Sequence, residues 1–225
     1  MNRNKIFLFI VILLILSAAG FYIYKDFSST KNTGKTENEE GLEKLLNDSD
    51  NKNNQDFVLK QEQDDSEDNI KILDLSKPAT IKADLPQDII SGAIKEISII
   101  SNTLKQDYRS VDGWIQLGLL RKLLGDFSGA KEAWELASSI APNNSISFHN
   151  LGFIYWQHYK NYEKAEQNYL KAVQNNKKDI IAFIDLSNIY YYDLKNSVKA
   201  RNILMEGLKE NPGDYELLRT LNDLK

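Results

Sequence analysis

Hydrophobic and polar positions follow three different patterns along the 225-residue chain. From Ile6 to Tyr24 the residues are uncharged and mostly apolar. From 25 to 69 polar and charged residues dominate, with only short apolar runs. From 86 onward apolar residues recur at spacings of three and four, which is the period of an amphipathic helix. The chain is therefore predicted to contain an apolar segment, a polar segment without a core and a helical domain.

The apolar segment 6–24 is long enough to cross a bilayer as a helix. At about 1.5 Å per residue, it reaches roughly 28 Å, close to the thickness of the hydrocarbon core. A small-residue stretch at Ser17 to Ala19 is typical of signal-peptide cleavage sites, so cleavage and secretion are one alternative. Because the apolar run continues through Phe21 to Tyr24, we favour an uncleaved transmembrane signal anchor.

Charges on both sides of the apolar segment bear on its orientation. Residues 1–5 form a short tail that carries Arg3 and Lys5, and such a tail usually stays inside the cell. We therefore expect a cytoplasmic tail, a single pass through the cytoplasmic (inner) membrane and an extracytoplasmic helical domain. Lysines also follow the segment before residue 36, so a cytoplasmic domain is the alternative.

The polar segment 25–69 is predicted to be a disordered acidic linker. Between 37 and 69 it carries twelve Asp or Glu against three Lys, and its densest apolar cluster is Phe57 to Leu59. Such a stretch cannot bury enough apolar surface to offset the entropy of ordering it. Residues 70–85, with apolar residues at alternate positions, are expected to be extended.

The helical region contains three similar stretches of 34 or 35 residues. An aromatic residue opens each stretch, a small residue follows four positions later, and an alanine comes after the turn. These positions are Trp114, Phe148 and Phe183; Gly118, Gly152 and Ser187; and Ala130, Ala165 and Ala200. The small residues suggest close approach of two paired helices in each stretch. Ser145 is expected to be the N-cap of the second stretch.

This pattern resembles the tetratricopeptide repeat, in which an aromatic, Leu-Gly, Tyr, Ala, an aromatic, Ala and Pro recur in about 34 residues. The resemblance implies an all-α solenoid of helical hairpins with repeats at 111–144, 145–179 and 180–214. Residues 86–110 are then a capping helix or a degenerate repeat, and 215–225 a C-terminal capping helix. Two departures are Arg121 in place of an aromatic residue and one extra residue in each of the later turns.

The resemblance also implies a concave groove, lined by the first helix of each repeat, that binds peptides or partner helices. Two alternatives stay open: the groove aromatics pack only between repeats, or residues 70–85 occupy the groove themselves. Only the asparagine remains of the Lys, Asn and Arg clamp by which related repeats grip a chaperone's terminal carboxylate, so that ligand is not expected. The predicted groove residues are Ile115, Leu119, Lys122, His149, Asn150, Phe153, Trp156, Gln157, Ile184, Asn188, Tyr191 and Tyr192.

Charge and composition exclude several other functions. The net charge is −4 and the largest imbalance is the acidic linker, whereas nucleic-acid-binding proteins usually present a basic face. The chain has no cysteine, and its two histidines, His149 and His158, form no metal-binding motif. It shows no serine elbow or dinucleotide fingerprint. We therefore expect no nucleic acid, metal, cofactor or enzymatic activity.

The combined features predict a membrane-tethered scaffold or adaptor for protein or peptide partners. The architecture resembles the single-pass tetratricopeptide accessory factors of bacterial envelopes, which implies a role in the assembly of, or secretion by, an envelope complex. The alternative is a self-associating structural subunit of a secretion, pilus or cell-envelope machine, in which the helix faces are subunit contacts.

Overall fold

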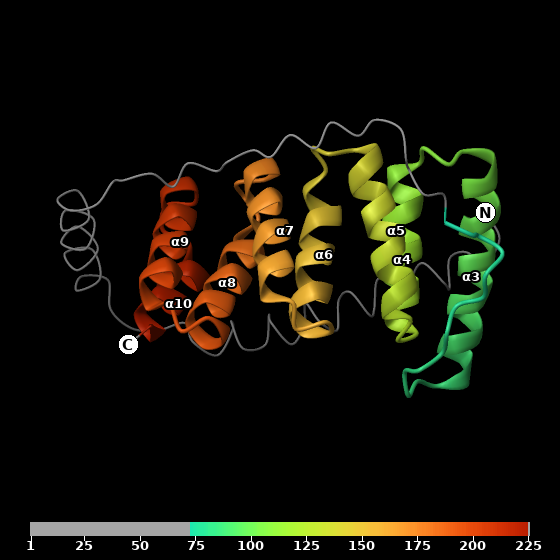
Figure 1. Cartoon of the computed structure of the whole chain (residues 1–225), viewed down its shortest axis with the longest axis horizontal. Coiled ribbons are helices and arrows are strands. Elements are labelled where there is room, and N and C mark those ends of the chain that lie inside the picture. Colours follow the sequence, from blue (N-terminus) through green and yellow to red (C-terminus); the bar gives the residue numbers. More distant parts are fainter. Residues whose placement is uncertain (1–72, 225) are drawn as a thin grey trace. The chain divides into compact units, whose positions relative to one another are not determined.

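The computed structural model describes residues 73–224, and the segments expected to form the anchor (6–24) and the acidic linker (25–69) lie outside this range. Within it every regular element is helical, which confirms the predicted all-α class for these residues. None of these helices is both long enough and apolar enough to span a bilayer. The elements, shown in Figure 1, are α3 (Gln87–Gln106), α4 (Val111–Leu123), α5 (Phe127–Ile140), α6 (Ser145–Gln157), α7 (Tyr162–Asn175), α8 (Ile180–Asn188), the π-helical turn η1 (Ile189–Asp193), α9 (Ser197–Glu210) and α10 (Tyr215–Asp223).

The helices pair as hairpins that follow one another in chain order (Figure 1). The pairs are α4 with α5, α6 with α7, and α8 with η1 and α9, and each pair packs on the next. They fall inside the expected repeats 111–144, 145–179 and 180–214, and we call them units one, two and three. Helix α3 packs on α4 before unit one, and α10 packs on α8 and α9 after unit three.

Side-chain caps recur with the same period as the core residues. The first helices of the three units and α10 begin after Ser110, Asn144, Asp179 and Asp214, and each cap accepts a hydrogen bond from the backbone N–H three residues on. Each such cap stabilises a helix by about 1 kcal/mol. Asn144 rather than Ser145 is the cap of unit two, because its side chain accepts from Ser147 and Ser145 is already helical.

Small residues allow the two helices of a unit to approach closely. A Cβ atom added at Gly118 would lie 2.2 Å from Nε1 of Trp134, and one at Gly152 would lie 2.8 Å from the Tyr169 ring. In unit three the corresponding Ser187 donates its hydroxyl hydrogen to the backbone oxygen of Ala200. Trp134 is fully buried at such a contact, where its indole N–H donates to the Ile115 carbonyl oxygen.

The extra residue of units two and three widens the turn between their helices. Gly125, Lys160 and Lys195 hold the same position in the three turns, and all have positive φ, 79°, 52° and 53°. In unit one the backbone N–H of Asp126 after the turn donates to the carbonyl oxygen of Arg121, five residues earlier. In units two and three the corresponding hydrogen bonds reach six residues back, from Asn161 to Tyr155 and from Asn196 to Tyr190. Unit three absorbs its extra residue partly in η1.

The non-helical segment 73–85 covers the turn of unit one and runs alongside α3 (Figure 1). Backbone N–H groups of Lys82 and Ala83 donate to the Leu124 carbonyl oxygen at 2.8 and 3.1 Å. Three apolar residues of the segment, Leu73, Leu75 and Ala79, pack against the core that α3, α4 and α5 share. The backbone contacts lie at the turn that ends α4 and the apolar contacts belong to the core of α3, α4 and α5, whereas the predicted groove positions are spread along α4, α6, α8 and η1.

Arg121 joins this segment to unit one. Its guanidinium is buried, pairs with Asp126 at 2.7 Å and donates to the Lys77 carbonyl oxygen at 2.9 Å. Tyr155 and Tyr190, at the same position in the later units, instead donate their hydroxyl hydrogens to Glu135 and Glu166 of the preceding unit. At Arg121, where the sequence departs from the repeat pattern, the side chain contacts the non-helical segment 73–85, whereas the tyrosines contact the preceding unit.

Candidate partner-binding face

Each first helix buries one side and leaves another toward solvent. In α6 the buried side includes Phe148, Leu151 and Tyr155, while Ile146, His149, Asn150, Phe153, Trp156 and Gln157 lie on the other side. The equivalent positions in the three units make up what we call the first-helix face. Its residues are Asp112, Ile115, Gln116, Leu119, Lys122 and Leu123; Ile146, His149, Asn150, Phe153, Trp156 and Gln157; and Ile181, Ile184, Asp185, Asn188, Tyr191 and Tyr192.

Large apolar side chains are exposed on this face in all three units. Leu119 is 42 % exposed, Ile146 54 %, Ile181 62 % and Tyr192 59 %. Ile146 and Ile181 are absent from the predicted groove residues. Their signal in the sequence is an isoleucine in the first turn of each helix that lies outside the i, i+3, i+7 core stripe. Exposed apolar side chains at repeated positions on neighbouring helices are typical of interaction surfaces.

The other predicted groove residues differ in how far they reach the surface. Gln157 is exposed, and Asn150 and Asn188 are partly exposed. Phe153, Trp156, Ile184 and Tyr191 are partly buried and pack against the core of units two and three, so part of each side chain serves packing between helices. Ile115 is only 7 % exposed and belongs to the core, so it is not available to a partner.

Two contacts join the units across this face. The Lys122 ammonium of unit one lies 4.7 Å from the centroid of the Phe153 ring in unit two, and burial lowers the pKa of this lysine. The indole N–H of Trp156 in unit two donates to Asp193 of unit three at 2.7 Å. These contacts fix the positions of the Lys122 and Trp156 side chains.

A polar cluster lies between units two and three at the same face. His149 Nδ1 is 2.8 Å from Asp179 Oδ2, and the Tyr169 hydroxyl donates to Asp185 Oδ2 at 2.9 Å. The His149 ring also meets the Tyr169 ring edge-on, with 5.5 Å between centroids. Burial raises the pKa of Asp185, although the Tyr169 hydrogen bond and the nearby His149 charge oppose that rise.

The groups on this face are suited to noncovalent binding. It offers apolar surface, side-chain amides, a lysine and several carboxylates. Among residues 73–224 no group of three or more His, Asp or Glu side chains is arranged to hold a metal ion.

Comparisons with known proteins agree with the repeat architecture. Residues 111–144 match the family model of the tetratricopeptide repeat. The structure of PilF from Pseudomonas aeruginosa is similar, with 19 % identity, a TM-score of 0.51, and coverage of 61 % of this chain and 66 % of that one. The MamA structure is similar at 16 % identity and a TM-score of 0.51, covering 64 % and 84 %.

These likenesses concern the fold alone, because the sequence identities are low. The chain spans about two thirds of the PilF structure. No curated protein matches the sequence. The core and cap positions of the matched repeat recur in 145–179 and 180–214. The chain therefore carries a tetratricopeptide repeat at 111–144, within a solenoid of similar helical hairpins.

Proposed function

We propose that the protein is a membrane-tethered adaptor that binds partner proteins or peptides on the first-helix face. The observation that carries this proposal is the exposure of Leu119, Ile146, Ile181 and Tyr192 on one face of three successive first helices. Because each of these side chains is about half exposed, a partner that buries it fully gains roughly half of the approximately 1.5–3 kcal/mol that burial of a whole apolar side chain provides. A partner that spans several units therefore gains from several contacts at once.

The membrane part of the proposal depends on the uncharged segment 6–24. As a single-pass anchor in the cytoplasmic membrane it would hold the repeats near lipid, and the acidic linker 25–69 would let them reach partners. Tethering raises the local concentration of a captured partner at the membrane. With the repeats outside the cytoplasm, we propose that the protein serves the assembly of, or secretion by, an envelope complex.

Site-specific photo-crosslinking in intact cells tests the binding face. A photoreactive phenylalanine analogue replaces Tyr192 or Ile181, and matched controls carry it at Val198 and Ile99, which are 68 % and 49 % exposed on other helices. The proposal expects the same adduct from 181 and 192 and none of it from the controls. Equal adducts at all four positions, or adducts only at the controls, would contradict a specific first-helix face.

The same experiment separates the adaptor from the self-associating subunit. An adduct with the mass of two copies of this chain would favour the structural alternative, whereas an adduct with another protein favours the adaptor. The anchor has its own test: after alkaline extraction, the full chain should stay with the membrane fraction. Protease added outside spheroplasts should digest the repeats, and protection of the repeats would place them in the cytoplasm instead.

A further inference from the structure

Charge is unevenly distributed over the first-helix face. Three carboxylates of unit three, those of Asp179, Asp185 and Asp193, lie on this face or at its border. Unit one contributes Asp112. The lysine on the face is Lys122, which lies over the Phe153 ring between units one and two. The part of the face that unit three forms is therefore apolar and negatively charged.

All three carboxylates of unit three have hydrogen-bond partners. Asp179 caps α8 through Oδ1, which accepts from the Ala182 N–H, and its Oδ2 lies against His149. Asp193 accepts from the Trp156 indole N–H. These hydrogen bonds fix the positions of both carboxylates.

Asp185, like Asp193, has a neutral hydrogen-bond donor and no ion pair, but it lies within α8 itself, on the side that carries Ile181. One oxygen accepts from the Tyr169 hydroxyl, and among the described residues no Lys, Arg or His lies within ion-pair distance of either oxygen. The carboxyl group is partly buried, and burial raises its pKa because the charged form loses hydration there. The Tyr169 hydrogen bond and the His149 charge lower it in part, whereas the nearby Asp179 charge raises it. A positive charge brought to this position would favour the charged form further.

The neighbours of Asp185 on its own helix complete the surface. Ile181 lies four residues before it and Asn188 three residues after it, so the three share one side of α8. Ile181 is 62 % exposed, and Tyr192 follows in η1 with 59 % exposure. A half-buried carboxylate thus lies between exposed apolar side chains, an arrangement that matches a segment with both apolar and basic side chains.

We propose that the first-helix face recognises apolar peptide segments that carry a lysine or arginine, with the basic side chain placed against Asp185 in unit three. This inference rests on the proposed function and adds the chemistry of the partner. A purely apolar segment would bury the Asp185 charge further without a counter-charge, and an acidic segment would add repulsion from Asp179 and Asp193. A basic side chain instead forms a charge-assisted hydrogen bond with the carboxylate.

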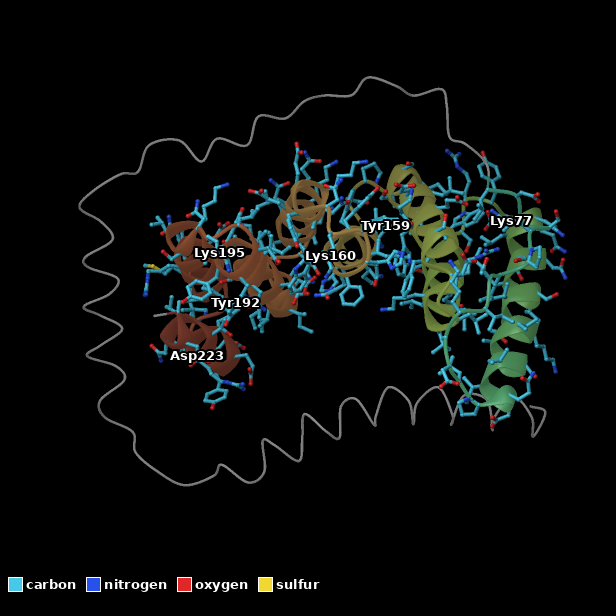
Figure 2. All side chains as sticks on the ribbon, turned by 60° about the horizontal axis from the view of Figure 1, so that its bottom comes forward. Lys77, Tyr159, Lys160, Tyr192, Lys195 and Asp223 are labelled. Atoms are coloured by element: carbon cyan, nitrogen blue, oxygen red, sulfur yellow. The ribbon has the colours of Figure 1, made fainter. Side chains whose placement is uncertain are left out.

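A random-peptide display library tests the inference while the natural partner is unidentified. The full chain, solubilised in detergent and immobilised, is panned in parallel as wild type, as Asp185→Asn and as Asp223→Asn. Asparagine keeps an oxygen that can accept from Tyr169, and Asp223 is an exposed carboxylate at the end of α10 (Figure 2). Wild type and Asp223→Asn should enrich peptides with apolar residues and Lys or Arg, whereas Asp185→Asn should lose the basic residue and keep the apolar ones.

A second arm needs no protein variant. The best wild-type peptide is resynthesised with its basic residue replaced by Gln and by Glu, and the affinities are compared at low and moderate salt. We expect the Gln peptide to bind about five- to tenfold more weakly and the Glu peptide more weakly still. Apolar peptides selected with no basic preference, together with equal affinity of the Gln peptide, would overturn the inference and leave the proposed function standing. A failure of wild type to select any peptide would overturn both.

Discussion

Units one and three share a fold but differ in the turn between their helices, in the buried residue at position 121 or 190, and in the apolar side chains that they expose. In unit one the turn is covered by residues 82 and 83, and the position of Tyr190 is taken by the buried Arg121. In unit three the turn carries the strained Lys195, and the adjoining face exposes Ile181 and Tyr192. Figure 2 shows Lys77 and Tyr192 at opposite ends of the row of helices. Unit one is therefore covered at its turn by the segment 73–85, whereas unit three exposes large apolar side chains, which is why we propose unit three as part of the binding face.

The largest expected effect concerns the buried ion pair of unit one. Replacing Arg121 with alanine leaves Asp126 buried without its counter-charge and removes the hydrogen bond to the Lys77 carbonyl oxygen. We expect a loss of about 3–5 kcal/mol in the free energy of unfolding. Chemical denaturation of the full chain measures it. Hydrogen exchange at the Lys82 and Ala83 amides should accelerate as well, and unchanged exchange there would show that Arg121 does not hold the segment.

The matched change in unit three should cost much less. Tyr190→Phe removes only the hydroxyl that donates to Glu166 at 2.8 Å, and the ring stays in the core. We expect a loss of about 0.5–1.5 kcal/mol in the same denaturation experiment. A cost equal to that of Arg121→Ala would mean that the two units do not differ in the way described.

Substitutions at the positive-φ turn residue, Gly125 in unit one and Lys195 in unit three, should change the stability of the domain in opposite directions. In unit one, Gly125→Ala places a Cβ atom 3.0 Å from the Ala83 nitrogen at a φ of +79°, so it should destabilise the domain by about 1–2 kcal/mol. In unit three, Lys195→Gly relieves a strained φ and should stabilise it by up to about 1 kcal/mol. Thermal melts of both variants check the signs, and Lys160→Gly provides a second copy of the stabilising change.

The smallest effect concerns Asp185 and depends on pH. Because the folded-state pKa of Asp185 is raised, the folded protein binds this proton more tightly than the unfolded chain does. The protonated carboxyl group therefore contributes to stability at low pH. This contribution is lost as the pH rises from about 4, the ordinary carboxyl pKa, through the raised pKa of Asp185 in the folded protein. The groups that face Asp185 are His149 on α6, Tyr169 on α7 and Asp179 before α8.

We therefore expect Asp185→Asn to gain stability relative to wild type between about pH 4 and neutral pH. Both proteins keep His149, Asp179 and Tyr169, so the difference isolates the Asp185 carboxyl. Denaturation at several pH values measures it, with Asp223→Asn as the control. A relative loss of stability over this range would mean that the Asp185 charge is favourable in the folded protein.

The helical hairpins could be predicted from the sequence because their causes are local and repeated. The spacing of aromatic, small and alanine residues locates each pair of helices, and the close contacts of Gly118 and Gly152 follow from the small-residue positions. The N-cap of unit two lies one residue earlier than the sequence pattern predicts. Asn144 and Ser145 are both good caps, and only the backbone conformation decides between them.

Features that depend on contacts between distant parts of the chain could not be predicted. Arg121 looks like a mere departure from the repeat, because its partner, the Lys77 carbonyl oxygen, lies 44 residues earlier in an irregular segment. Ile115 occupies a groove position by register but is buried. The unusual setting of Asp185 arises from Tyr169 and His149 on two other helices, which no spacing within α8 reveals.

The most direct test of the binding face is the affinity of two double variants of the full chain for the same selected peptide, measured by isothermal titration calorimetry. The first carries Ile181→Ser and Tyr192→Ser, and the control carries Val198→Ser and Tyr215→Ser, which are similarly exposed elsewhere. Losing two buried apolar contacts should weaken binding by the first variant more than about tenfold, with the control unchanged. Equal affinities for both variants would contradict the assignment of the first-helix face as the site where partners bind.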